Sequence, residues 1–219
     1  MTEILDKIKQ WSHDFHKLAD HGRVEDLIPD EARFLFLLES PHVHELKHGA
    51  PVSGTSGASM TKHLYEDTYG KEPLGLVVKK GLDPNRPIAL MNVCTLPMQG
   101  KAYTSADAEQ AHHALIHILE GIRTKNDRDH YPHPDWNAVQ DLLVENLRSR
   151  LRQLRDREMT LVPCGRFAQK FFRLADVHSP KWRIIEDIPH PSYNNWGKPA
   201  YAEQVDTLKR EFHRVRERY

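Results

Sequence analysis

Short, continuous apolar runs alternate with amphipathic stretches along almost the whole of this 219-residue chain. Four runs have the length and composition of buried strands: Phe34–Leu38, Ile88–Val93, Met159–Pro163 and Trp182–Ile188. Between them, apolar residues recur at steps of three and four, which is the period of a helix. Strands that alternate with helices form parallel βαβ units. We therefore predict a three-layer α/β/α fold around a central four-stranded parallel sheet.

The amphipathic pattern also locates the helices. We expect an N-terminal helix over residues 2–20 and further helices near residues 58–69, 104–122, 143–154, 167–174 and 201–215. Thr104, followed by Asp107, has the character of a helix start. The polar segment 123–136 contains two prolines and is expected to be a surface insertion. No repeat or break in composition divides the chain, so residues 1–219 are expected to form a single domain.

Composition excludes several classes of protein. Apolar residues make up 39% of the chain and charged residues 28%, as in an ordinary soluble globular protein. No apolar stretch approaches the roughly 20 residues that span a bilayer, and the first residues lack a signal-peptide pattern. The cysteines are Cys94 and Cys164, too few for a disulfide framework or the four thiolates of an iron–sulfur cluster. These features predict a cytoplasmic protein that does not enter a membrane.

The charge balance bears on nucleic-acid binding. Basic and acidic residues both number 31, so the formal net charge is zero. Dedicated nucleic-acid-binding domains are often strongly basic, which counts mildly against that class. A local basic face is still compatible with a neutral chain.

Two polar segments follow predicted strands and are the best candidates for a site. The first begins with Glu39 and Ser40 and continues through a loop with several glycines to residue 57, and the second is His190-Pro191-Ser192-Tyr193. In an open parallel sheet, ligands bind at the carboxyl ends of the strands. Both segments are therefore expected to border one binding site.

The same segments resemble motifs of the uracil-DNA glycosylase superfamily, whose thermophile-type iron–sulfur branch has a first motif G-E-A-P-G-x-x-E-D-x-x-G-x-P-F-V-G-x-A-G. Seven residues fall on that motif without a gap: Glu39, Pro41, Glu45, Gly49, Pro51, Gly54 and Gly57. Three later segments resemble the family's strand-end Asn, its third strand and its closing H-P-S motif: residues 90–93, 161–170 and 190–192. The four matches occur in the family's order and cover roughly residues 33–196.

The resemblance implies roles for individual residues. The catalytic residues would be His190, Glu39 and Glu45, with His190 donating to the base oxygen on which charge develops. The base would be bound by Asn92, His42, Ser40 and Val52. Phosphate groups of DNA would be contacted by Gly54, Gly57, Ser192 and Tyr193. No cofactor and no metal are implied.

The chain departs from the family pattern at several of these positions. Ser40 stands where the best-known branch has its catalytic Asp, and His42 where that branch has a Tyr that excludes thymine. Val52 replaces the aromatic residue that stacks on the flipped base, a contact worth about 1–3 kcal/mol. The residue that is usually wedged into the duplex corresponds to Asn194, with Tyr193 or Trp196 as alternative wedges.

The resemblance implies an N-glycosylase that removes a deaminated base from single- or double-stranded DNA, acts as a monomer and leaves an abasic site. A first alternative is a non-catalytic module that keeps the fold to bind a base, a nucleotide or nucleic acid. A second is a hydrolase of free nucleosides or nucleotides.

Clusters of histidine and arginine allow further predictions. His42, His44 and His48 lie near Glu39 and Glu45 in sequence. Carboxylate partners would raise the pKa values of these histidines, so that binding of nucleic acid strengthens as the pH falls from about 8 to 6. A divalent metal is the alternative for this loop, but we expect a loop that is simply rich in histidine. The arginines between residues 148 and 157 are expected on a solvated helix face.

Overall fold

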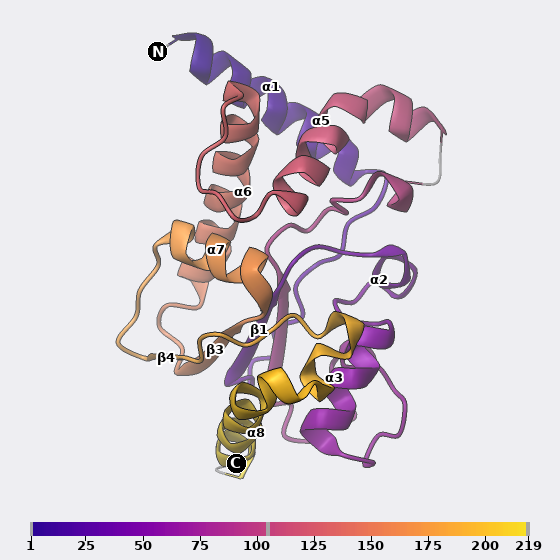
Figure 1. Ribbon diagram of the computed structural model, residues 1–219, viewed down its shortest axis with the longest axis vertical. Helices are drawn as coiled ribbons and strands as arrows, with labels where there is room; N and C mark the ends of the chain where they lie inside the picture. The colour runs from indigo at the N-terminus through magenta and orange to yellow at the C-terminus, as the bar shows by residue number, and fades with distance from the viewer. Residues whose placement is uncertain (1, 104–105, 218–219) are drawn as a thin grey trace.

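The computed structural model describes residues 2–103 and 106–217. Among them the strands form one parallel, four-stranded sheet in the order β2-β1-β3-β4. The strands are β1 (Phe34–Leu38), β2 (Ile88–Asn92), β3 (Met159–Pro163) and β4 (Trp182–Ile184). Helices cover both faces of the sheet, which confirms the predicted three-layer α/β/α fold (Figure 1). The last strand is shorter than predicted: it ends at Ile184, and the left-handed φ of 60° at Asp187 takes the chain out of the extended conformation before the predicted end at Ile188.

The alternation of side chains along β1 explains how both faces become buried. Phe34, Phe36 and Leu38 pack on one face, and Leu35 and Leu37 pack on the other. All five residues are at most 1% exposed. Successive residues of a strand point to opposite faces, so a continuous apolar run is the pattern of a strand covered on both sides.

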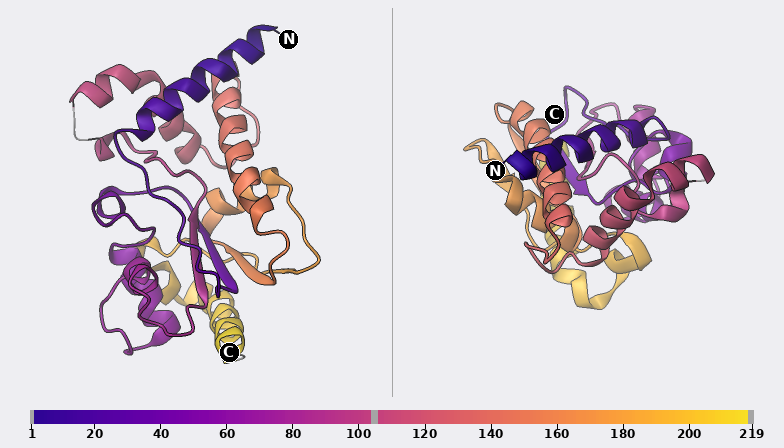
Figure 2. Two further views of the ribbon diagram at one scale, coloured as in Figure 1. Left: turned by 180° about the vertical axis from the view of Figure 1, so that it is seen from behind. Right: turned by 90° about the horizontal axis from the view of Figure 1, so that it is seen from above.

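One face of the sheet is covered by α1 (Thr2–Ala19), α5 (Ala106–Thr124), α6 (Pro134–Gln153) and α7 (Gly165–Ala175). Helix α1 crosses α5 and α6 at the outside of this layer (Figure 2). The helix start predicted at Thr104 lies outside the described residues. The segment between α5 and α6, which was expected as a surface insertion, is anchored by Tyr131, whose side chain is 1% exposed.

The other face is covered by α3 (Thr55–Tyr65), α4 (Leu74–Lys79) and α8 (Ala202–Arg216). The helix predicted over 58–69 begins earlier and ends at Tyr65, because Glu66 has a left-handed φ of 55°. The sequence did not reveal α4 or the short helix α2 (Val43–His48). Short 3₁₀ segments are η1 (Gly100–Ala102), η2 (Ser192–Gly197) and η3 (Pro199–Tyr201). No helix of the described chain is long and apolar enough to cross a membrane.

Candidate active site

A wide cleft of about 1510 Å³ opens at the carboxyl ends of the strands. Its volume exceeds the roughly 300–1,000 Å³ of a small-molecule pocket, so it has room for part of a polymer. The cleft is lined by ten of the eleven predicted site residues: Glu39, Ser40, His42, Glu45, Val52, Gly54, Asn92, His190, Ser192 and Tyr193. The structure thus brings together residues that are up to about 150 positions apart in sequence.

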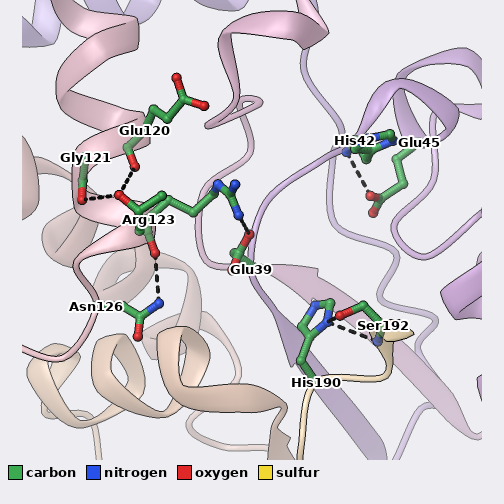
Figure 3. Close-up of polar contacts among 10 residues, drawn as sticks. Glu39, His42, Glu45, Glu120, Gly121, Arg123, Asn126, His190 and Ser192 are labelled. Carbon is green, nitrogen blue, oxygen red and sulfur yellow. Dashed lines mark hydrogen bonds and ion pairs between the residues drawn. The ribbon is translucent and has the colours of Figure 1, made fainter. Parts of the chain in front are cut away.

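Glu39 follows the last residue of β1 and forms an ion pair that the sequence did not predict. Its Oε1 atom lies 3.3 Å from the Nη1 atom of Arg123, in the last turn of α5 (Figure 3). Burial raises the pKa of Glu39, and the positive charge of Arg123 opposes that shift. The pair therefore brings a carboxylate and a guanidinium group together inside the cleft.

Glu45 is held by the backbone of its own loop. Its Oε2 atom accepts the N–H of His42 at 2.8 Å, and its Oε1 atom accepts the N–H of Val52 at 2.7 Å. Burial raises the pKa of Glu45 to about 7, against the opposing effect of these hydrogen bonds and of the nearby amide of Asn92. Glu45 borders the cleft, but its two oxygen atoms fix the ends of the loop between residues 42 and 52.

Val52 and Gly57 form the tightest backbone packing of the site. Val52 has a left-handed φ of 46°, which is rare for a β-branched residue. A Cβ atom at Gly57 would lie 1.6 Å from the carbonyl oxygen of Val52. Gly57 is buried and does not line the cleft, so the predicted phosphate contact is replaced by a packing role. Val52 does line the cleft and is 6% exposed.

His190 lies beyond β4, and its imidazole is fixed through the Nδ1 atom. This atom lies 2.8 Å from Ser192 Oγ and accepts the backbone N–H of Ser192 at 3.2 Å (Figure 3). Because a backbone N–H only donates, Nδ1 is unprotonated and the neutral ring carries its proton on Nε2. Burial and Arg123 lower the pKa of His190 to about 4, so the ring is neutral at physiological pH.

Gly165 allows His190 to reach this place. It follows β3 with a left-handed φ of 82°, and its N–H donates to the carbonyl of Ile188 at 2.8 Å. A Cβ atom at this position would lie 2.7 Å from the Cβ atom of His190. Only glycine allows the end of β3 and the segment with His190 to approach so closely.

Three buried polar atoms at the cleft have no partner within hydrogen-bond distance among the described residues: Ser40 Oγ, Asn92 Nδ2 and Arg123 Nε. Asn92 Nδ2 is nevertheless near enough to the carboxyl group of Glu45 to lower its pKa. Asn92, the last residue of β2, is 1% exposed. Leaving a buried donor unpaired costs about 1–3 kcal/mol. Three such groups at one cleft indicate that a ligand rich in acceptors, or ordered water, completes them.

The turn after His190 presents one aromatic side chain and buries another. Tyr193 and Asn194 adopt left-handed φ values of 55° and 51°. Tyr193 is 89% exposed at the rim of the cleft. Trp196 is 2% exposed and donates to the carbonyl of Pro189 at 2.8 Å, so the prediction that it could act as a wedge is wrong.

The predicted pKa increase in the histidine loop is wrong for His42. Its pKa is lowered by burial and by the positive charges of Lys101, His44 and Arg123. The expected carboxylate partner is engaged elsewhere, because Glu45 accepts backbone N–H groups. Within the part of the chain that the structure describes, no group of three or more His, Cys, Asp and Glu side chains is arranged to hold a metal ion.

Sequence reasoning missed several basic residues of the site: Lys101, Arg123 and Arg166 line the cleft. Arg123 directly follows Ile122, the last residue of the apolar stripe of α5. This position next to the buried face of the helix was the only sequence feature that could have indicated its place in the cleft. The prediction of a solvated face for the arginines between 148 and 157 is wrong for Arg148, Arg150 and Arg157, which are partly buried, whereas Arg152 and Arg155 are exposed. Arg148, Arg150, Arg155 and Arg157 donate to backbone carbonyls of neighbouring segments.

The comparison with protein families agrees with this geometry. The model of the uracil DNA glycosylase superfamily matches residues 25–212. The chain belongs to this superfamily. A search of curated protein sequences finds no significant match. The family match covers all four strands and every residue of the candidate site.

Proposed function

We propose that this superfamily member hydrolyses the N-glycosidic bond of a deaminated base, such as uracil, in DNA. The observation that supports this best is the neutral imidazole of His190, whose Nδ1 atom is engaged by Ser192 while the ring borders the cleft. A neutral imidazole with its proton on Nε2 is a hydrogen-bond donor for the carbonyl oxygen of a departing base. The enzyme would extrude the base from the strand and leave an abasic site.

The other unpaired groups fit this reaction. The amide of Asn92 pairs with the polar edge of the base, for which its Nδ2 atom, near Glu45 but outside hydrogen-bond distance of any described acceptor, supplies a donor. The carboxylate of Glu39 orients water toward C1′ and stabilises the positive charge that develops on the sugar. The C1′–N bond breaks, and the base leaves with the bonding electrons as an anion whose oxygen accepts a hydrogen bond from His190. The water oxygen bonds to C1′, its proton passes to Glu39, and that proton is later given up to the solvent or the base. Glu45 supports the loop, and Gly54 and Ser192 border the phosphates.

The second candidate is a non-catalytic module that binds a base or nucleotide, and Ser40 favours it. This residue follows Glu39 at the cleft, and its buried Oγ atom has no partner among the described residues. A hydroxyl group does not act as a carboxylate base, so this position supplies a ligand contact instead of chemistry. A thermal-shift screen with free bases and nucleotides distinguishes the candidates, because a module stabilised by a nucleotide shows no turnover.

Base release from oligonucleotides tests the proposed function. Single- and double-stranded substrates with one uracil, hypoxanthine or xanthine are incubated with the protein, and abasic sites are detected by alkaline cleavage. His190→Ala is expected to lower kcat by about 10²–10³-fold, the usual loss for a donor to a developing oxyanion. The matched control is His178→Ala, because this histidine is 86% exposed and pairs with Asp176 away from the cleft. Absence of release from every substrate by the unaltered protein contradicts the proposal.

A further inference from the structure

We propose that Asp26 and Arg150 position Asn92 for base recognition by holding its backbone at the free edge of the sheet. This inference rests on the proposed function, because it assigns Asn92 to the base. Neither residue lines the cleft, so both act through Asn92.

The free edge of β2 requires partners for its backbone. Leu90 exchanges hydrogen bonds with Leu27, with N···O distances of 2.8 and 2.9 Å, so its N–H and C=O point away from β1. Asn92 is two residues further along, and its backbone groups therefore point to the same side. The segment before β1 next bonds at Val24, whose N–H donates to the Thr95 carbonyl at 3.0 Å, so within the described chain no backbone group pairs with Asn92 at this edge.

Arg150 and Asp26 fill this gap with side chains. Arg150, in α6, donates from Nη1 to the Asn92 carbonyl at 2.8 Å and from Nη2 to the Val93 carbonyl at 2.6 Å. The same Nη1 atom lies 2.9 Å from Asp26 Oδ1 and 3.1 Å from Oδ2. Burial raises the pKa of Asp26, and the positive charge of Arg150 and the N–H of Asn92 oppose that shift. The side chains of Arg150 and Asp26 are 16% and 13% exposed.

The position of this ion pair matters for the site. Beyond Asn92, the N–H groups of Val93 and Cys94 donate to the carbonyls of Leu38 and Glu39 at 3.0 and 3.1 Å. The end of β2 is thereby held on one side by β1, which carries Glu39, and on the other by the Asp26–Arg150 pair. Asn92 cannot shift relative to Glu39 without breaking one of these sets of hydrogen bonds.

The test removes both charges together. Loss of one partner would leave a buried charge and unfold the protein, whereas replacing both with apolar residues is often tolerated. Asp26→Leu/Arg150→Met also removes the donors to the carbonyls of Asn92 and Val93, so it is expected to lower the Tm by several degrees but to stay folded. Its kcat is expected to fall about 10²-fold, with a smaller change in KM. The matched control is Asp83→Leu/Arg216→Met, which removes another partly buried pair, 3.1 Å apart, away from the cleft and is expected to keep its kcat.

A double-mutant comparison separates positioning from general structure. If the pair acts through Asn92, the double substitution has almost no further effect on kcat in an Asn92→Ala background. An equal loss in both backgrounds overturns the proposal.

A second readout is the pair of side-chain amide signals of Asn92 in an ¹⁵N–¹H spectrum, assigned by their absence in Asn92→Ala. These signals are expected to shift or split in the double variant, and unchanged signals overturn the proposal whatever the activity. If the unaltered protein releases no base, the proposed function fails and the amide signals alone decide whether the pair positions Asn92.

Discussion

The two loops that carry the sequence motifs differ in how they use their polar groups. In the first loop, residues 39–57, Glu45 accepts two backbone N–H groups and Gly57 packs under the carbonyl of Val52. In the second loop, residues 185–197, His190 engages Ser192 through one nitrogen only, and Tyr193 remains 89% exposed. Much of the first loop thus holds its own conformation, whereas the second presents groups to a ligand.

This difference explains why the first motif is long and specific to the family, whereas the second is a short triplet. The first motif is long because its glycines and Glu45 satisfy packing and backbone bonding at several positions. The second is a triplet because only the placement of one imidazole has to be fixed. A long motif therefore indicates that packing and backbone hydrogen bonds constrain many positions, and a short motif can still carry a catalytic residue.

Substitution of Gly57 in the first loop has the largest expected effect on stability, and Gly54 of the same loop supplies its control. Gly57→Ala places a Cβ atom 1.6 Å from the Val52 carbonyl oxygen and is expected to lower the free energy of unfolding by about 3 kcal/mol. Gly54→Ala is the matched control, because its Cβ atom would meet His44 at 3.5 Å, an ordinary contact, and is expected to cost less than about 0.5 kcal/mol.

Urea denaturation measures both variants. Equal stability of the two would show that Gly57 has no special packing role. If Gly54 approaches a phosphate, Gly54→Ala weakens DNA binding without loss of stability, which a filter-binding assay at constant salt measures.

The fold was largely predictable from the sequence because strands buried on both faces leave a simple pattern. Phe34–Leu38 and Met159–Pro163 were predicted with the bounds that the structure shows. The pattern fails where backbone conformation decides. The left-handed φ of Glu66 ends α3 earlier than apolar periodicity indicates, and that of Asp187 takes the chain out of the extended conformation before the predicted end of β4 at Ile188. No side-chain signal marks either residue.

The candidate site was predictable where residues follow strands or fall on the family motifs. Residues that follow strands share one edge of the sheet whatever their separation in sequence, and this rule brought Glu39, Asn92 and His190 together. Arg123 and Arg150 come from helices, and the position of a helical side chain relative to a strand end depends on how the layers pack. The contact of Glu39 with Arg123 spans 84 residues and has no local signature.

Arg123 adds a charge to the cleft that comes from neither loop, and its removal is expected to affect the reaction more than stability. Its Nε atom has no partner among the described residues, and its single ion pair is partly exposed. Arg123→Met is expected to lower kcat/KM about tenfold, a loss of about 1.4 kcal/mol, and to change the free energy of unfolding by less than about 1 kcal/mol.

The control for Arg123 is Arg152→Met, an arginine that is 62% exposed and lies outside the cleft. It is expected to change neither quantity. A fully active Arg123→Met variant would exclude this arginine from the site.

Tyr193 tests whether the second loop contacts DNA more closely than the first. An exposed aromatic side chain at the cleft can insert between base pairs and stabilise the extruded base. Tyr193→Ala is expected to lower base release from duplex DNA about fivefold, since stacking on one base is worth about 1–3 kcal/mol. Release from single strands is expected to fall much less, because a single strand has no base pairs between which the side chain inserts. Val43→Ala is the control, because Val43 is an apolar side chain of the first loop that is 40% exposed. Equal losses for both substrates contradict a wedge role.

The pH dependence of stability is the smallest expected signal, and its sign differs between the two loops. The pKa of His190 is lowered to about 4, so between pH 4 and 6.5 the unfolded chain binds more protons at this residue and its contribution to stability rises with pH. The pKa of Glu45 is raised to about 7, so between pH 4.5 and 7 the folded chain binds more protons and its contribution falls as the pH rises.

Difference curves isolate these two groups, because subtracting the unfolding free energy of a variant that cannot titrate there removes most of the titration that both proteins share. The unaltered protein minus His190→Gln is expected to give a curve that rises with pH, and the unaltered protein minus Glu45→Gln one that falls. Neither slope exceeds about 1.4 kcal/mol per pH unit, the limit for one proton. Urea denaturation at pH values from 4 to 8 and constant ionic strength measures both. A buried neutral imidazole and a buried protonated carboxyl group change the free energy of unfolding with pH in opposite directions. Slopes of the same sign would therefore contradict the predicted difference between the two loops.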